Sequence, residues 1–207
     1  MQSLQQYVES AIISRYHTFD NAHNYSHVKA VIDESVSLAS HYGVNIDMAY
    51  VVAAYHDVGI PYGRELHHIH SARILMEDEH LRQWFTSDQL RTMKEAIEDH
   101  RASSDHAPRS IYGCIVADAD RDLDVNTVIL RAMQYGQSHY PNMNREQMYV
   151  RTCAHLKEKY AEGGYLTLYL SYGKAQRQLQ QLRAVISDEC KLRQHFDSLY
   201  ERLIQEK

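Results

Sequence analysis

Apolar residues recur every three to four positions along most of the chain, which is the period of an amphipathic helix. The first such stretch covers residues 4–17 and is followed by a polar loop over residues 19–25. Ser26 can cap a second helix that runs to Tyr42, where Gly43 ends it. Eight further helices are predicted over residues 46–57, 67–77, 86–100, 110–118, 124–136, 144–160, 173–187 and 188–205. No segment reads convincingly as a strand, so the pattern predicts an all-α fold.

The segment 46–57 differs from the others because it is apolar nearly all round. A helix of that kind is expected to be central and buried, and Gly59 and Pro61 follow its end. Its uninterrupted apolar run, residues 48–55, is too short to span a bilayer, so we expect no membrane helix.

The composition supports long helices in one domain. Eight glycines and three prolines in 207 residues are few for an all-β fold, and no linker or repeat divides the chain. We therefore expect one domain over residues 1–207. The net charge of −5, without a basic block, argues against binding a nucleic-acid polymer. Three widely spaced cysteines and an N-terminus unlike a secretion signal lead us to expect a cytoplasmic protein.

Histidine is the unusual residue, since eight of the fourteen fall between His17 and His70. His56 and Asp57 end the buried helix, where an imidazole and a carboxylate can share a divalent cation. The negative end of the helix dipole favours a cation there, and a buried unpaired Asp57 would be costly. The competing interpretation is that the histidines are surface residues and that the His-Asp pair is structural.

Two other segments could supply further ligands. His27 lies at the edge of the inward stripe of its helix, and an acidic stretch, residues 117–124, follows an apolar run. Both Asp118 and Asp120 could face inward, and helical geometry does not decide between them.

These residues, in this order, resemble the HD superfamily of metal-dependent phosphohydrolases. The resemblance is carried by His27-Val28-x-x-Val31, by His56-Asp57-Val58-Gly59 and by Ala119-Asp120-Arg121. It implies an HD-domain helical bundle with a core at about residues 20–135 and packing helices over residues 140–207.

The resemblance implies that His27, His56, Asp57 and Asp120 bind one divalent ion, which could be Mn, Mg, Fe or Zn. Asp57 would also hold or deprotonate a water molecule. Asp118 would instead hold a ligand histidine or the helix end.

Some members of the superfamily bind a second metal through later histidines. His67, His68 and His100 occupy comparable places here, and His68 and His100 are candidate catalytic groups with Asp57. Arg64, Arg101 and Arg121 are candidate phosphate contacts. Ile60-Pro61 departs from the Lys or acid that many relatives place after the glycine.

The leading hypothesis is a phosphohydrolase that acts on a small phosphorylated metabolite or a nucleotide. A di-iron oxygenase of the same superfamily would need a second metal and six ligands. A nucleotide-binding regulatory module would hold its metal in a closed, purely structural shell. The sequence specifies neither the substrate nor the oligomeric state.

Overall fold

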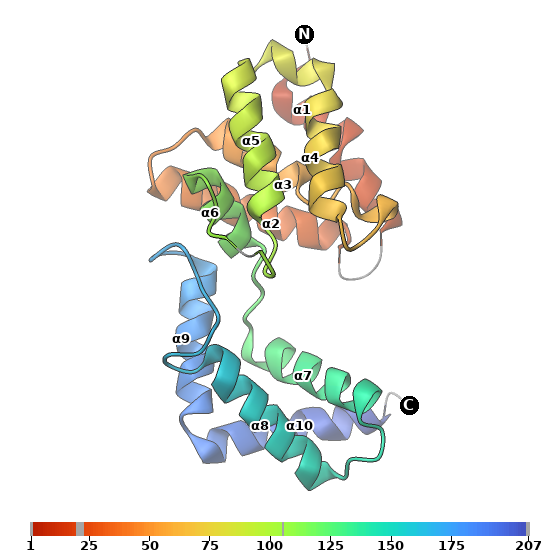
Figure 1. Ribbon diagram of the computed structural model, residues 1–207, viewed down its shortest axis with the longest axis vertical. Coiled ribbons are helices and arrows are strands. Elements are labelled where there is room, and N and C mark those ends of the chain that lie inside the picture. The colour runs from red at the N-terminus through yellow and green to blue at the C-terminus, as the bar shows by residue number, and fades with distance from the viewer. Residues whose placement is uncertain (1, 20–22, 105, 206–207) are drawn as a thin grey trace. The chain divides into compact units, whose positions relative to one another are not determined.

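The computed structural model describes residues 2–19, 23–104 and 106–205. Within these ranges the chain forms ten α-helices and three short 3-10 helices, and no strand (Figure 1). The predicted all-α fold is confirmed. None of the described helices is long and apolar enough to cross a membrane.

The chain divides into two compact units. The first comprises Met1–Arg121 with Tyr169–Gly173, and the second comprises Asp122–Leu168 with Lys174–Lys207. Each unit has a hydrophobic core of its own. This division differs from the expected single domain with a core at 20–135, because the boundary falls at residue 121 and a later segment returns to the first unit.

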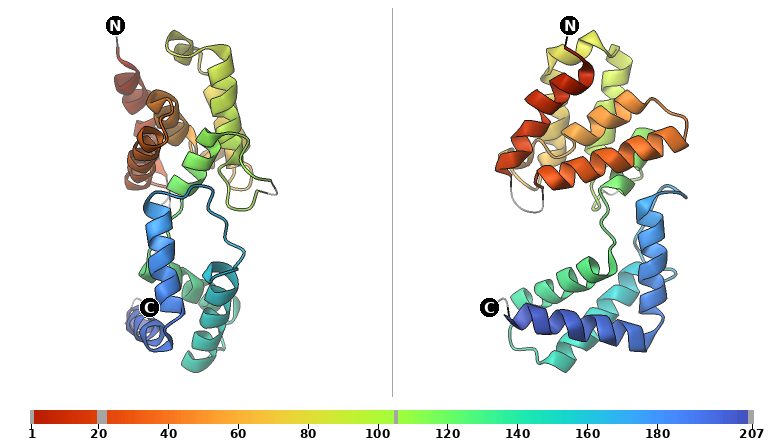
Figure 2. Two further views of the ribbon diagram at one scale, coloured as in Figure 1. Left: turned by 90° about the vertical axis from the view of Figure 1, so that its left-hand side faces the viewer. Right: turned by 180° about the vertical axis from the view of Figure 1, so that it is seen from behind.

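The first unit contains the helices α1 (Leu4–Ala11), α2 (Tyr25–His41), α3 (Ile46–Tyr55), α4 (His67–Glu77), α5 (Ser87–Asp99) and α6 (Ile111–Ala119). The apolar helix α3 packs against α2, α5 and α6, and Val51 and Tyr55 are fully buried. α4 and α5 lie side by side and run in opposite directions (Figures 1 and 2). The start of α4 and the end of α5 therefore meet at one end of the unit.

Several helix boundaries differ from the sequence pattern. The cap of α2 is Asn24, whose side chain accepts the N–H of His27, so the helix starts before Ser26. The predicted helix 4–17 is α1 followed by a 3-10 helix, Ile13–Thr18, and this tighter turn buries both Ile12 and Ile13. The predicted loop 19–25 includes residues outside the described ranges.

The second unit contains α7 (Val125–His139), α8 (Arg145–Tyr160), α9 (Lys174–Ile186) and α10 (Glu189–Gln205). Ile129, Leu156 and Phe196 are fully buried in its core. α7 continues past Gly136, where the sequence predicted its end. A Cβ on Gly136 would lie 2.6 Å from the sulfur of Met148, so the glycine permits the close approach of α8.

A short segment, Tyr169–Gly173, belongs to the first unit although it lies between helices of the second. Leu170 is buried in the core of the first unit. The ring of Tyr172 stacks on His41 at 3.8 Å, and Gly173 adopts a positive φ of 124° beside Leu38. We call this segment the return strap.

Candidate metal centre

His56 and Asp57 directly follow the last residue of α3, and both side chains are buried. The buried phenol of Tyr16 holds this turn, because its hydroxyl donates to the carbonyl of Ala54 at 2.9 Å and accepts the N–H of Asp57 at 3.3 Å. Burial and then the charge of Asp57 raise the pKa of Tyr16, so the hydroxyl keeps its proton. The sequence pattern did not reveal this role of Tyr16.

One group of donors collects on the Oδ2 side of Asp57. The Nε2 atom of His56 lies 3.2 Å from Oδ2, and Nε2 of His27 lies 3.7 Å from it. Oδ1 of Asp120 lies 3.1 Å from Nε2 of His27 and 3.8 Å from Nε2 of His56. The structure thus brings together the four residues that the resemblance implied as ligands, from α2, the end of α3 and the end of α6.

A second group collects on the Oδ1 side of the same carboxylate. Nε2 of His67 lies 3.1 Å from Oδ1 of Asp57, and Nε2 of His100 lies 3.6 Å from it. These two Nε2 atoms are 3.1 Å apart. His67 begins α4 and His100 follows α5, so the antiparallel packing of these helices brings the two imidazoles together (Figure 1).

The backbone fixes the tautomer of three of these histidines. Nδ1 of His56, His67 and His100 each lies 2.7 Å from a backbone carbonyl, respectively that of Ala53, Arg64 and Ile97. A carbonyl oxygen only accepts, so each Nδ1 carries the proton and each Nε2 presents a lone pair in the neutral imidazole. This is the arrangement that orients histidine ligands in metal sites.

The residues fit a divalent ion. His27, His56 and Asp57 form one group that could hold a metal, and Asp57, His67 and His100 form another. The Nε2 atoms of His27 and His56 are buried and make no hydrogen bond, which is costly for a polar atom unless a ligand completes it. Two neutral Nε2 atoms 3.1 Å apart, as in His67 and His100, also need a cation or a proton between them.

The electrostatics of the centre favour positive charge. Burial disfavours a charged His56, but the adjacent carboxylate of Asp57 and then Asp120 raise its pKa to about 9. Burial also opposes charge on Asp57 and Asp120, yet the neighbouring histidines keep the pKa of both carboxyl groups below the usual value. Two carboxylates among four imidazoles therefore attract a proton or a cation.

Gly59 allows the second group to form. A Cβ on Gly59 would lie 2.5 Å from the carbonyl oxygen of His67 and 2.6 Å from the backbone nitrogen of Ser71. Ser71 also accepts the N–H of Gly59 through its side chain, at 2.9 Å. The glycine of the His-Asp-Val-Gly motif thus permits the close contact between the end of α3 and the start of α4.

His68 does not join the two groups. It lines a neighbouring cavity of about 770 Å³ that includes Arg101, Ser103 and Ser104. Burial and then the charge of Arg101 lower the pKa of His68 to about 4, so this imidazole is neutral at neutral pH. Its buried Nδ1 has no hydrogen-bond partner.

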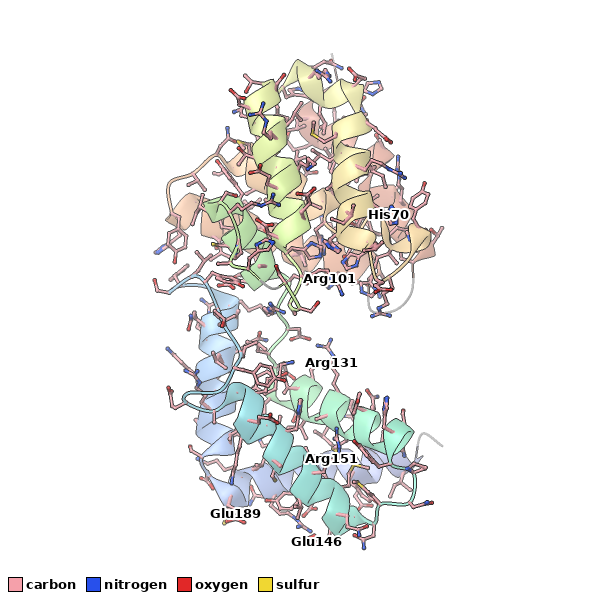
Figure 3. The ribbon with its side chains drawn as sticks, viewed as in Figure 1. His70, Arg101, Arg131, Glu146, Arg151 and Glu189 are labelled. Carbon is pink, nitrogen blue, oxygen red and sulfur yellow. The ribbon has the colours of Figure 1, made fainter. Side chains whose placement is uncertain are left out.

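The candidate phosphate-binding arginines have different surroundings. Arg101 lies at the end of α5 (Figure 3), and its Nη1 donates to the carbonyl of Glu65 at 2.6 Å. Arg121 directly follows Asp120, and its buried Nε has no hydrogen-bond partner. Arg64 supplies the carbonyl that fixes the tautomer of His67.

Asp118 has partners that the sequence did not suggest. Its carboxylate is buried and accepts the backbone N–H groups of Tyr169 and Leu170 from the return strap, at 2.8–3.2 Å. Among the described contacts it neither joins the metal-ligand groups nor holds a ligand histidine. The physical reason is that it occupies the face of α6 that packs under the strap, whereas Asp120 lies at the helix end.

An ion-pair cluster anchors the loop that lines the cavity beside His68. The buried carboxylate of Asp99 accepts the N–H of Arg109 at 2.7 Å and pairs with its guanidinium, which also contacts Glu98 at 2.7 Å. Sequence reasoning missed this cluster, because Asp99 and Arg109 sit in an ordinary polar stretch.

Two of three comparisons with known proteins found a match. The model of the HD domain family matches residues 24–123, all but the last two of which lie in the first unit. A search of curated proteins found no match. A solved structure, described as a predicted HD superfamily hydrolase from an uncultured Thermotogales bacterium, is similar with a TM-score of 0.51 and 22% sequence identity. The similarity covers 73% of this chain and 87% of that one, and it supports the helical fold.

Proposed function

We propose that this chain is a metal-dependent hydrolase that cleaves a phosphate ester of a small phosphorylated metabolite or nucleotide. The observation that carries the proposal is the position of Asp57, whose two carboxylate oxygens face two separate groups of histidine Nε2 atoms. The HD domain match supports the same class of activity.

The ligand residues divide into two sets that share Asp57. His27, His56 and Asp120 would hold an ion on one side, and His67 and His100 would hold a second ion on the other. Such ions lower the pKa of a water molecule and offset negative charge on phosphoryl oxygens. This assignment gives His100 a ligand role in place of the catalytic role suggested by the sequence.

The remaining residues would bind and orient the substrate. The cavity beside His68 has the size of a small-molecule site, and Arg101, which lines it, would contact a phosphoryl group there. His68 is a neutral imidazole, so it would orient the substrate through a hydrogen bond rather than carry a positive charge to it. The carboxylate of Asp57 would accept a proton from the attacking water.

A phosphate-release screen tests this proposal. Untreated protein would first be analysed for bound metal, then assayed on a panel of nucleotides and sugar phosphates with Mn²⁺, Mg²⁺, Fe²⁺ or Zn²⁺. We expect metal-dependent phosphate release, which His56→Ala should abolish together with the ion held by His27, His56 and Asp120. His70→Ala is the matched control, because His70 lies on α4 (Figure 3) and outside both ligand groups. No release across the panel from metal-loaded protein would contradict the proposal.

The six candidate ligand residues, which are four histidines and two aspartates, also fit a second candidate function, that of a di-iron oxygenase. Imidazole and carboxylate ligands together suit iron. Iron in untreated protein, with substrate-dependent oxygen uptake and no phosphate release, would favour that function.

A further inference from the structure

The second unit contains a cavity of about 540 Å³ between α7 and α8. Its walls carry three permanent cations, Arg131, Arg151 and Lys159, together with His155. None of the described residues that line it is acidic. Arg131 and Arg151 lie on neighbouring helices of this unit (Figure 3). The cavity shares no residue with the metal centre.

Arg151 is held in place within this cavity. Its guanidinium carbon lies 5.0 Å from the ring centre of Tyr135 and 5.4 Å from that of Tyr140. Its Nη1 donates to the carbonyl of Ala132 at 2.9 Å. The other nitrogens, Nε and Nη2, have no hydrogen-bond partner among the described residues, so a positioned guanidinium retains donors for a ligand.

The other two cations complete a positive surface. Lys159 places its ammonium 5.2 Å from the ring centre of Tyr160. Arg131 is exposed, and its acidic neighbour among the described residues is Asp122, at 3.9 Å. Burial, and then the charges of Lys159 and Arg151, lower the pKa of His155, whereas Glu158 opposes this shift.

The net charge of the whole chain does not explain why positive side chains gather around this cavity. The chain carries a net charge of −5, whereas residues 122–168 and 174–207 hold 12 Lys and Arg against 10 Asp and Glu. Like charges around one concave surface repel, and an anion with several charges would relieve that repulsion.

We propose that this cavity is a binding site for a small phosphorylated anion, with Arg151 as its central contact and Arg131 and Lys159 beside it. A phosphoryl or pyrophosphoryl group matches the planar donors of arginine and the number of positive charges. The volume lies within the range of small-molecule sites. The proposal does not depend on the hydrolase activity of the first unit.

Calorimetric titration of the full chain with inorganic pyrophosphate tests this site. The titration would be done in EDTA, so that the metal centre holds no ion, and at constant ionic strength because salt screens such interactions. We expect saturable binding to the wild-type protein and at least about tenfold weaker binding to Arg151→Gln, the loss expected for one charged hydrogen bond.

Two further variants make the result decisive. Arg131→Gln removes an exposed side chain that the fold does not need, and it should also weaken binding. Arg177→Gln removes one exposed positive charge from α9 of the same unit and should bind pyrophosphate within about twofold of wild type. The proposal is overturned if the wild-type protein shows no saturable binding up to about 10 mM. It is also overturned if Arg131→Gln and Arg151→Gln both bind as tightly as Arg177→Gln.

Discussion

The carboxylate of Asp118 accepts the backbone N–H of Leu170 at 2.8 Å, across a separation of 52 residues. The same carboxylate accepts the N–H of Tyr169, at 3.0 Å. These bonds attach the return strap to α6, the helix whose end presents Asp120 to the metal centre. A buried acid two residues before a candidate metal ligand thus serves the packing of the first unit.

Replacing Asp118 should destabilise the first unit. Asp118→Ala removes the acceptor of the buried N–H of Leu170, at a cost of about 1–3 kcal/mol, and that of the half-buried N–H of Tyr169, at a smaller cost. Asp118→Asn retains one oxygen and should cost less. Urea unfolding followed by the fluorescence of Trp84, which is the single tryptophan and lies in this unit, measures both variants. An Asp118→Ala protein as stable as wild type would show that these bonds contribute nothing.

Metal binding should separate Asp118 from Asp120. Asp120→Asn weakens a donor that lies 3.1 Å from Nε2 of His27, so bound metal should fall sharply. Asp118→Asn should keep most of its metal, because its carboxylate is already engaged by the strap. Metal analysis after dialysis against a trace of the ion compares the two. Greater loss from Asp118→Asn would mean that the ligand is misassigned by two residues.

Gly59→Ala should damage the second ligand group more than the first. The added methyl would meet the backbone of α4 at 2.5–2.6 Å, so α4 must shift and carry His67 away from Asp57. We expect weaker binding of one ion while the ion held by His27 and His56 is retained. Gly63→Ala gives a steric control, since no atom lies within 4 Å of a Cβ there, although its positive φ adds strain. Equal metal content in Gly59→Ala and wild type would contradict the conclusion that Gly59 lets His67 approach Asp57.

The ion pairs of Glu98 should stabilise the folded protein at neutral pH and should cease to do so in acid. Burial opposes the charge of Glu98, but Lys94 and Arg109 lower its pKa below 4.5. A carboxyl whose pKa is lowered on folding stabilises the protein above its unfolded pKa, and this stabilisation is lost as the pH falls through the folded value. Glu98→Gln should therefore be less stable than wild type by about 0.5–1 kcal/mol at pH 7. This difference in stability should vanish at a pH below the pKa of Glu98 in the folded protein. Urea unfolding at pH 7 and at that lower pH measures it, and a difference that persists at the lower pH would contradict the prediction.

The sequence predicted the helices well because their signals are local. The apolar stripe of α2, the all-round apolar character of α3 and the cap Ser110 of α6 are each contained within a few residues. A predicted helix start was wrong where two nearby residues can each cap the helix, as Asn24 and Ser26 can at the start of α2. Both residue types are good caps, and only the contacts of the folded chain select one.

The long-range relationships could not be predicted in the same way. His67 and His100 meet only because α4 and α5 pack antiparallel, and no spacing in the sequence encodes that contact. The strap on Asp118 and the division into two units likewise depend on tertiary packing. The resemblance to the HD superfamily supplied the candidate ligands, which periodicity alone left open and which the structure brings together.

The most direct test of the account is the number of divalent ions bound per chain by wild type and by Asp57→Ala. Asp33→Ala, which removes an exposed acid from α2, serves as the control. Because Asp57 faces both ligand groups, we predict that Asp57→Ala loses both ions while wild type and Asp33→Ala bind two. Trp84 fluorescence should show that the variant remains folded. A folded Asp57→Ala protein with the metal content of wild type would contradict the shared centre.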